Sequence, residues 1–128
     1  MARVTLQALG KEKGKFLSHA NNSVSLTDGI HGEGEVFVIQ KLPRDRVAIA
    51  CVGAEIGKYL SHASGEVTLK EGIMGEGEEW VMVEHELPNV SFNCAGSENN
   101  KTLSHANGKV GLQDGYKGEG ELWSKSSI

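Results

Sequence analysis

The sequence repeats itself three times at a constant spacing. Three copies of Leu-Ser-His-Ala place His19, His62 and His105 43 residues apart, and glycine, valine, leucine and lysine positions keep the same spacing without insertion or deletion. The copies cover residues 3–45, 46–88 and 89–128. Because an internal repeat constrains a fold more than any local pattern does, the chain is expected to build one body from three like units.

Each copy is expected to contain about four short strands. Residues 4–8 alternate apolar and polar side chains, which is the period of a half-buried strand. Residues 15–18 and 24–26 give a second and a third strand around a polar turn, and residues 35–39 give a fourth. No window has a helical period of useful length, and 17 glycines would interrupt one. The sequence therefore predicts an all-β chain of about twelve short strands.

Three near-equal copies select one all-β architecture. Propellers close with about four to eight blades, and solenoids need distinct capping repeats. We therefore predict a β-trefoil with pseudo-threefold symmetry, a single domain over residues 1–128 in which six strands form a short barrel and three hairpins cover its end. The predicted core consists of equivalent apolar residues of the three copies: Val4, Val47, Val90, Leu6, Ile49, Phe92, Leu17, Leu60, Leu103, Val24, Val67, Val110, Leu26, Leu69, Leu112, Phe37, Trp80 and Trp123.

Composition narrows the classes of partner. A net charge of −4 argues against nucleic acid. No apolar run approaches the roughly 18 residues of a membrane span, and no apolar signal segment follows Met1, so we expect no membrane insertion and a protein that is cytoplasmic or released without a signal peptide. Cys51 and Cys94 share one repeat position and are expected to be small buried apolar residues rather than a disulfide.

The second copy carries the clearest family resemblance. It reads Gly-Lys-Tyr-Leu-Ser at residues 57–61, Gly-Glu-Val-Thr-Leu at 65–69 and Gly-Glu-Gly-Glu-Glu-Trp at 75–80. This pattern resembles the fascin and hisactophilin group of actin-associated trefoils and, more loosely, the ricin-B-type lectins. Their Gln-x-Trp signature corresponds to Glu78-Glu79-Trp80, with Glu in place of Gln. The resemblance implies a trefoil fold and two kinds of partner, actin filaments or glycans.

Polar residues that recur in every copy are the candidate ligand-binding residues, because the copies can diverge wherever packing does not hold them. They comprise a histidine, an acid after the third strand and the first glutamate of a Gly-Glu-Gly-Glu loop. The nine residues are His19, Asp28, Glu33, His62, Glu71, Glu76, His105, Asp114 and Glu119. If hairpin pairing brings imidazole, carboxylates and loop amides together, each copy forms a shallow polar cup that suits sugar hydroxyls. We therefore expect a lectin-like protein with up to three equivalent sites, binding glycans or glycoconjugates multivalently.

Two observations keep other interpretations open. Strand alternation puts His19 on the same face as Leu17, so the repeated histidine is alternatively a buried structural residue that ties the hairpin to a loop carbonyl or to Asp28. Only 5% of the residues are aromatic, whereas sugar sites commonly use an aromatic face.

The alternative function is binding of actin filaments, which are acidic and require a local basic face. The basic residues of the first copy and first junction that would supply it are Lys11, Lys13, Lys15, Lys41, Arg44 and Arg46.

Catalysis, metals and cofactors are not expected. The adjacent Ser-His pair of each copy points to opposite faces of a strand, and no Ser-His-Asp or Cys-His set is present. The Glu-Gly-Glu loops lack the ligand spacing of an EF-hand, and nothing matches a zinc pattern. The sequence leaves the identity of the sugar and the oligomeric state open.

Overall fold

The computed structural model describes residues 3–128 and contains four strands in each copy. They are β1 (Arg3–Ala8), β2 (Phe16–Ser18), β3 (Ser25–Thr27), β4 (Phe37–Leu42), β5 (Arg46–Cys51), β6 (Lys58–Ser61), β7 (Thr68–Glu71), β8 (Trp80–Glu84), β9 (Asn89–Cys94), β10 (Lys101–Ser104), β11 (Gly111–Asp114) and β12 (Trp123–Ser127). Short 3₁₀ turns link them, and none of the helical turns described is long and apolar enough to cross a membrane. The all-β prediction, with its period of four strands, is confirmed.

Six of the strands close into a barrel. Around the ring, β1 pairs with β4, β4 with β5, β5 with β8, β8 with β9, β9 with β12 and β12 with β1, all antiparallel. The β1–β12 pairing runs from Val4 opposite Ser127 to Ala8 opposite Trp123 and joins the first strand to the last. All three copies are therefore needed to close the ring, and each barrel strand has a partner on both sides.

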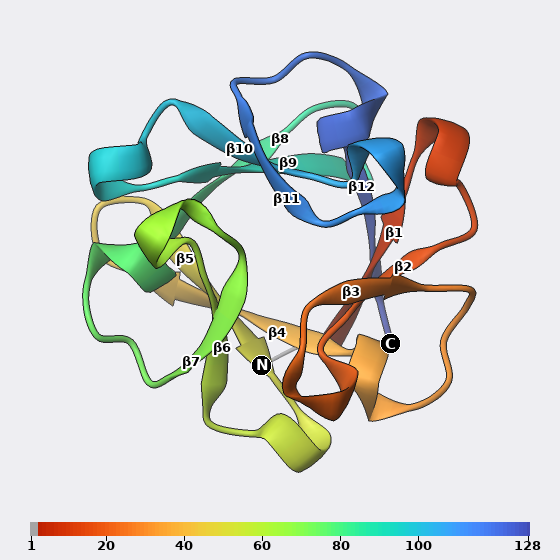
Figure 1. The fold of residues 1–128 in the computed structure, drawn as a ribbon, viewed down its shortest axis with the longest axis horizontal. Helices are drawn as coiled ribbons and strands as arrows, with labels where there is room; N and C mark the ends of the chain where they lie inside the picture. The colour runs from red at the N-terminus through yellow and green to blue at the C-terminus, as the bar shows by residue number, and fades with distance from the viewer. Residues whose placement is uncertain (1–2) are drawn as a thin grey trace.

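The other six strands form three hairpins, β2–β3, β6–β7 and β10–β11, which are arranged around the pseudo-threefold axis (Figure 1). Each hairpin joins the barrel through one residue pair, as Gln7 of β1 does with Phe16 of β2. Gln7 lies near the late end of β1, and the pairs Ala50–Tyr59 and Asn93–Thr102 repeat that position. The hairpins therefore cover one end of the barrel, whereas the β4–β5 turn lies at the other.

The core follows the predicted layers. The largest fully buried side chains include one aromatic and two aliphatic or aromatic residues per copy: Leu6, Leu17, Phe37, Ile49, Leu60, Trp80, Phe92, Leu103 and Trp123. The predicted core residues in and just before the third strands pack against this core but are only partly buried: Val24, Leu26, Val67, Leu69, Val110 and Leu112. Cys51 and Cys94 are free and buried, as expected, and burial raises the pKa of each thiol to about 12.

Candidate functional site

The three repeated histidines lie inside the protein. Each has an exposed fraction of 0%. The Nε2 atom of His19 donates to the carbonyl oxygen of Val36 at 3.0 Å, and its Nδ1 atom lies 2.8 Å from Oε1 of Glu55. Each of the two ring nitrogens therefore already has an oxygen atom of the protein within hydrogen-bond distance. No face or nitrogen of His19 is left for a ligand.

The same arrangement recurs at the other two histidines. The Nδ1 atom of His62 lies 3.0 Å from Glu98, and that of His105 lies 2.9 Å from Glu12. In each case Nε2 bonds a backbone carbonyl, at 2.8 and 2.9 Å respectively. Each ring also stands edge-on to the buried aromatic residue of its own copy, with centroids 4.8–4.9 Å apart. The geometry favours the structural alternative for all three predicted site histidines.

The glutamate partners come from the next copy in cyclic order. His19 of the first copy meets Glu55 of the second, His62 of the second meets Glu98 of the third, and His105 of the third returns to Glu12 of the first. We call these three pairs the inter-repeat pairs. Glu12, Glu55 and Glu98 also recur at the 43-residue spacing. The recurrence that made the histidines candidate site residues therefore applied to these glutamates as well.

A second glutamate of each loop is also structural. Glu35 is 2% exposed; it accepts a hydrogen bond from the Ser18 hydroxyl at 2.8 Å and another from the backbone N–H of His31 at 2.7 Å. Glu78 and Glu121 bind their serines and loop amides in the same way. These carboxylates hold the glycine-rich loops against the hairpins, and the bonds explain why each copy keeps a polar residue before its aromatic residue.

The predicted hairpin acids lie away from the histidines. In the β2–β3 register Ser18 faces Ser25 and Phe16 faces Thr27, so Asp28 belongs to the end of the hairpin that is remote from His19. Asp28 lies 3.7 Å from the Lys15 ammonium. The structure therefore does not assemble imidazole and hairpin acid into one cup.

The equivalents of Asp28 are arranged in the same way. Glu71 is exposed opposite Lys58 in the β6–β7 register. Asp114 bonds Lys101 at 2.9 Å, and this ammonium lowers the pKa of the Asp114 carboxyl. Asp28 and Asp114 therefore pair with lysines on the exposed hairpins, whereas the Lys58 ammonium donates to the Asn22 side chain at 2.6 Å.

The remaining predicted acids, Glu33, Glu76 and Glu119, lie on the surface at the junctions between copies. Each begins a 3₁₀ turn and rests on a glycine of the neighbouring copy. Gly10 has φ +75°, and a β-carbon built on it would lie 3.0 Å from the β-carbon of Glu119. Gly53 and Gly96 take the same place beneath the other two glutamates. The glycines are therefore required by backbone conformation and by close contact together.

Two of these junction glutamates are neutralised and the third is not. Arg3 bonds Glu33 at 3.2 Å, and Arg46 bonds Glu76 at 2.7 Å. The hydrogen bond from Arg46 lowers the pKa of Glu76. The third copy has Asn89 at this repeat position. Within residues 3–128, no basic side chain forms an ion pair with Glu119.

A shallow groove of about 280 Å³ opens beside this free carboxylate. We call it the junction groove; its lining consists of Gly10, Lys11, Glu12, Ala106, Asn107, Glu119 and Gly120. Lys11, Asn107 and Glu119 are exposed, and they supply an ammonium donor, an amide and a carboxylate acceptor. Among the nine predicted site residues, Glu119 is the one that lines the groove; His105 lies beneath it, bonded to Glu12.

The basic residues of the alternative hypothesis do not gather on one face. Lys11 and Lys13 follow the hairpin end of β1, whereas Lys41 and Arg44 lie at the β4–β5 turn, at the other end of the barrel. Arg46 is engaged by Glu76 and by Glu79, at 2.7 and 2.8 Å.

No cluster of three or more His, Cys, Asp or Glu residues suited to a metal ion occurs in the described part of the chain.

Comparisons with known proteins rest on structure alone. Neither a protein-family model nor a curated protein sequence matches the chain. The designed threefold-symmetric protein ThreeFoil is 14% identical, with a TM-score of 0.80 over 98% of this chain and 99% of that one. SeviL, solved bound to the asialo-GM1 saccharide, is 15% identical, with a TM-score of 0.77 over 98% and 97% of the two chains. Hisactophilin is 20% identical, with a TM-score of 0.76 over the full length of both. The chain is therefore a β-trefoil, with the threefold architecture that its sequence predicts.

Proposed function

We propose that the protein is a carbohydrate-binding, lectin-like β-trefoil that recognises glycans through the junction groove. The single observation that carries the proposal is the free Glu119 carboxylate, which lies in a polar groove with Lys11 and Asn107. A carboxylate that no basic side chain of residues 3–128 neutralises can accept two hydroxyl hydrogen bonds from a sugar, while the ammonium and the amide donate to the sugar's other oxygens.

The other two junctions lack this combination. Glu33 and Glu76 are bonded to arginines, and the position of Lys11 is taken by Ala54 and Ser97. We therefore propose one principal site between the third and first copies instead of three equivalent ones. This changes the expected binding behaviour, because a single site gives no avidity within one molecule.

The first experiment is a glycan array, followed by calorimetric titration with the sugars that bind. Glu119→Gln should weaken binding about ten- to a hundredfold, since a hydrogen bond to a charged group contributes about 1.5–3 kcal/mol. Lys11→Ala, which introduces the residue that the second copy has at this position, should also weaken binding. Glu33→Gln is the matched control at the equivalent position and should bind as the parent protein does.

Two results would contradict the proposal: an array without any binding, or unchanged affinity in Glu119→Gln. Co-sedimentation with actin filaments at low and high salt tests the other function. Pelleting that weakens with salt would support actin binding through the basic residues instead.

A further inference from the structure

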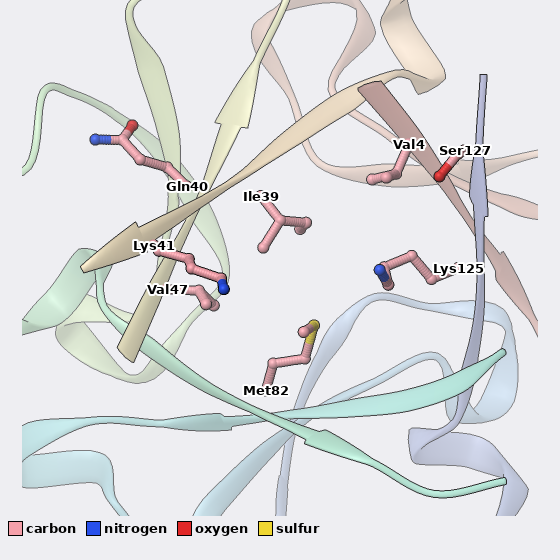
Figure 2. Close-up of a pocket in the computed structure, with 8 residues that line it drawn as sticks. All are labelled: Val4, Ile39, Gln40, Lys41, Val47, Met82, Lys125 and Ser127. Atoms are coloured by element: carbon pink, nitrogen blue, oxygen red, sulfur yellow. The ribbon is translucent and has the colours of Figure 1, made fainter. Parts of the chain in front are cut away.

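A separate cavity opens at the end of the barrel opposite the hairpins. It has a volume of about 560 Å³, within the usual range for small-molecule pockets. Val4, Ile39, Val47 and Met82 give it an apolar wall (Figure 2). We call it the barrel-mouth cavity. Its residues come from the barrel strands β1, β4, β5, β8 and β12, and none of them lines the junction groove.

One residue in this cavity breaks the threefold pattern. Ile39, Met82 and Lys125 occupy the same repeat position, so an ammonium stands where two copies have apolar side chains. Lys125 lies opposite Leu6 in the β1–β12 register, and its side chain is half-buried. Barrel packing accounts for isoleucine and methionine at this position, but a lysine adds a charge that the packing does not use.

A second lysine, Lys41, places another ammonium group at the barrel-mouth cavity. Lys41 also lines the cavity, and Figure 2 shows the amines of Lys41 and Lys125 turned toward the space between Ile39 and Met82. Within residues 3–128, neither lysine forms an ion pair with a carboxylate. The cavity therefore combines an apolar wall with two uncompensated positive charges at its entrance.

We propose that the barrel-mouth cavity binds a medium-chain aliphatic carboxylate. The hydrocarbon tail would lie against Val4, Val47 and Met82, and the carboxylate would accept hydrogen bonds from Lys125 and Lys41. A neutral apolar ligand would leave both ammonium groups without a partner, and an inorganic anion would leave the apolar wall in water. An amphipathic anion satisfies both. The proposal does not depend on the carbohydrate site at the opposite end.

The test is a calorimetric titration of the full chain with octanoate and with decanoate at pH 7.4, below their critical micelle concentrations. Decanoate should bind about tenfold more tightly than octanoate, because each buried methylene contributes about three- to fourfold in affinity. Octanol and octyltrimethylammonium are the ligand controls, and both should bind more weakly than octanoate.

Variants of Lys125 test whether its ammonium group binds the carboxylate. Lys125→Met installs the residue of the second copy and should reduce the affinity for decanoate about tenfold or more, while binding of octanol is retained. Lys125→Arg should keep most of the affinity. Lys70→Met, on an exposed hairpin position, is the matched control and should behave as the parent protein does.

Three outcomes would overturn the inference. Absence of decanoate binding would show that the cavity does not take such ligands. Equal affinities of the parent protein and Lys125→Met would remove the role of the lysine. Equal binding of octanoate and octyltrimethylammonium would show that the site does not recognise an anion. Glu119→Gln, which alters the junction groove, should leave decanoate binding unchanged, so failures of the two proposals are distinguishable.

Discussion

Replacement of His62 by alanine should destabilise the fold strongly, because this side chain has an exposed fraction of 0% and makes two hydrogen bonds. The bond to the Glu98 carboxylate is of the charged kind, about 1.5–3 kcal/mol, and the bond to the Glu79 carbonyl contributes about 0.5–1.5 kcal/mol. The edge-on contact with Trp80, at 4.8 Å, adds about 0.5–1.5 kcal/mol. The expected loss is about 3–5 kcal/mol, a large part of the roughly 5–15 kcal/mol that a domain has.

The assay is urea denaturation followed by tryptophan fluorescence. His62→Ala should lower the urea midpoint with little change of slope, and should lower the melting temperature by on the order of 10 °C or more. Glu98→Gln should cost less, because the amide oxygen can still accept a hydrogen bond. A double-mutant cycle of the two changes should give a coupling energy of about 0.5–3 kcal/mol. His31→Ala, an exposed histidine of the first copy, is the matched control and should stay within about 0.5 kcal/mol of the parent protein.

The reasoning would be refuted if His62→Ala unfolded at the same urea concentration as His31→Ala and lost glycan binding instead. That result would restore the histidines to the ligand-binding site that the sequence predicts.

Two further predictions concern the thiols and a junction glycine. Cys51 and Cys94, with pKa values raised to about 12 by burial, should react with a disulfide reagent at pH 8 only as fast as the protein opens; immediate labelling of the folded protein would contradict the buried arrangement. Gly53→Ala should destabilise by about 1–3 kcal/mol, because Gly53 has φ +78° and a β-carbon there would lie 2.9 Å from the β-carbon of Glu33. Gly57 is the control, because it also has a positive φ, +96°, but a β-carbon there would meet no atom within 4 Å. Gly57→Ala should therefore lose only the stability that backbone strain costs, and its loss in the same urea titration should be smaller than that of Gly53→Ala. Equal losses would show that the contact with Glu33 does not contribute.

The strands and the core could be predicted because both follow from the repeated alternation of apolar residues. A residue such as Leu6 is fixed by its own strand, and its copies Ile49 and Phe92 report the same burial independently. The barrel then follows from the number of copies, since three sets of strands have few ways to close.

The environment of the histidines could not be predicted from strand alternation. Alternation shows that His19 faces inward, but its partner Glu55 lies 36 residues away in the next copy, and only the packing of one copy on another reveals the pair. The hairpin register was equally decisive, because it places Asp28 beside Lys15 and away from His19.

The candidate sites appear where the repetition fails. Glu119 is distinguished from its copies by Asn89, which replaces an arginine, and the barrel-mouth cavity is distinguished by Lys125. Identity across copies in this chain reports mostly on architecture, because each copy must form the same bonds with its neighbour. The differences between copies at Asn89 and Lys125 are visible in the sequence. Their link to a groove or a cavity could not be inferred, because it depends on which side chains the fold brings to the same surface.

The cyclic order of the inter-repeat pairs bears on how the chain acquires its structure. The pair between His105 and Glu12 spans 93 residues, so it can form only after nearly the whole polypeptide has left the ribosome. An isolated repeat would hold a histidine and a glutamate that cannot meet each other. Three separate repeats, in contrast, could complete all their bonds by assembling as a ring, so a 43-residue peptide from this chain is expected to be ordered only as a trimer.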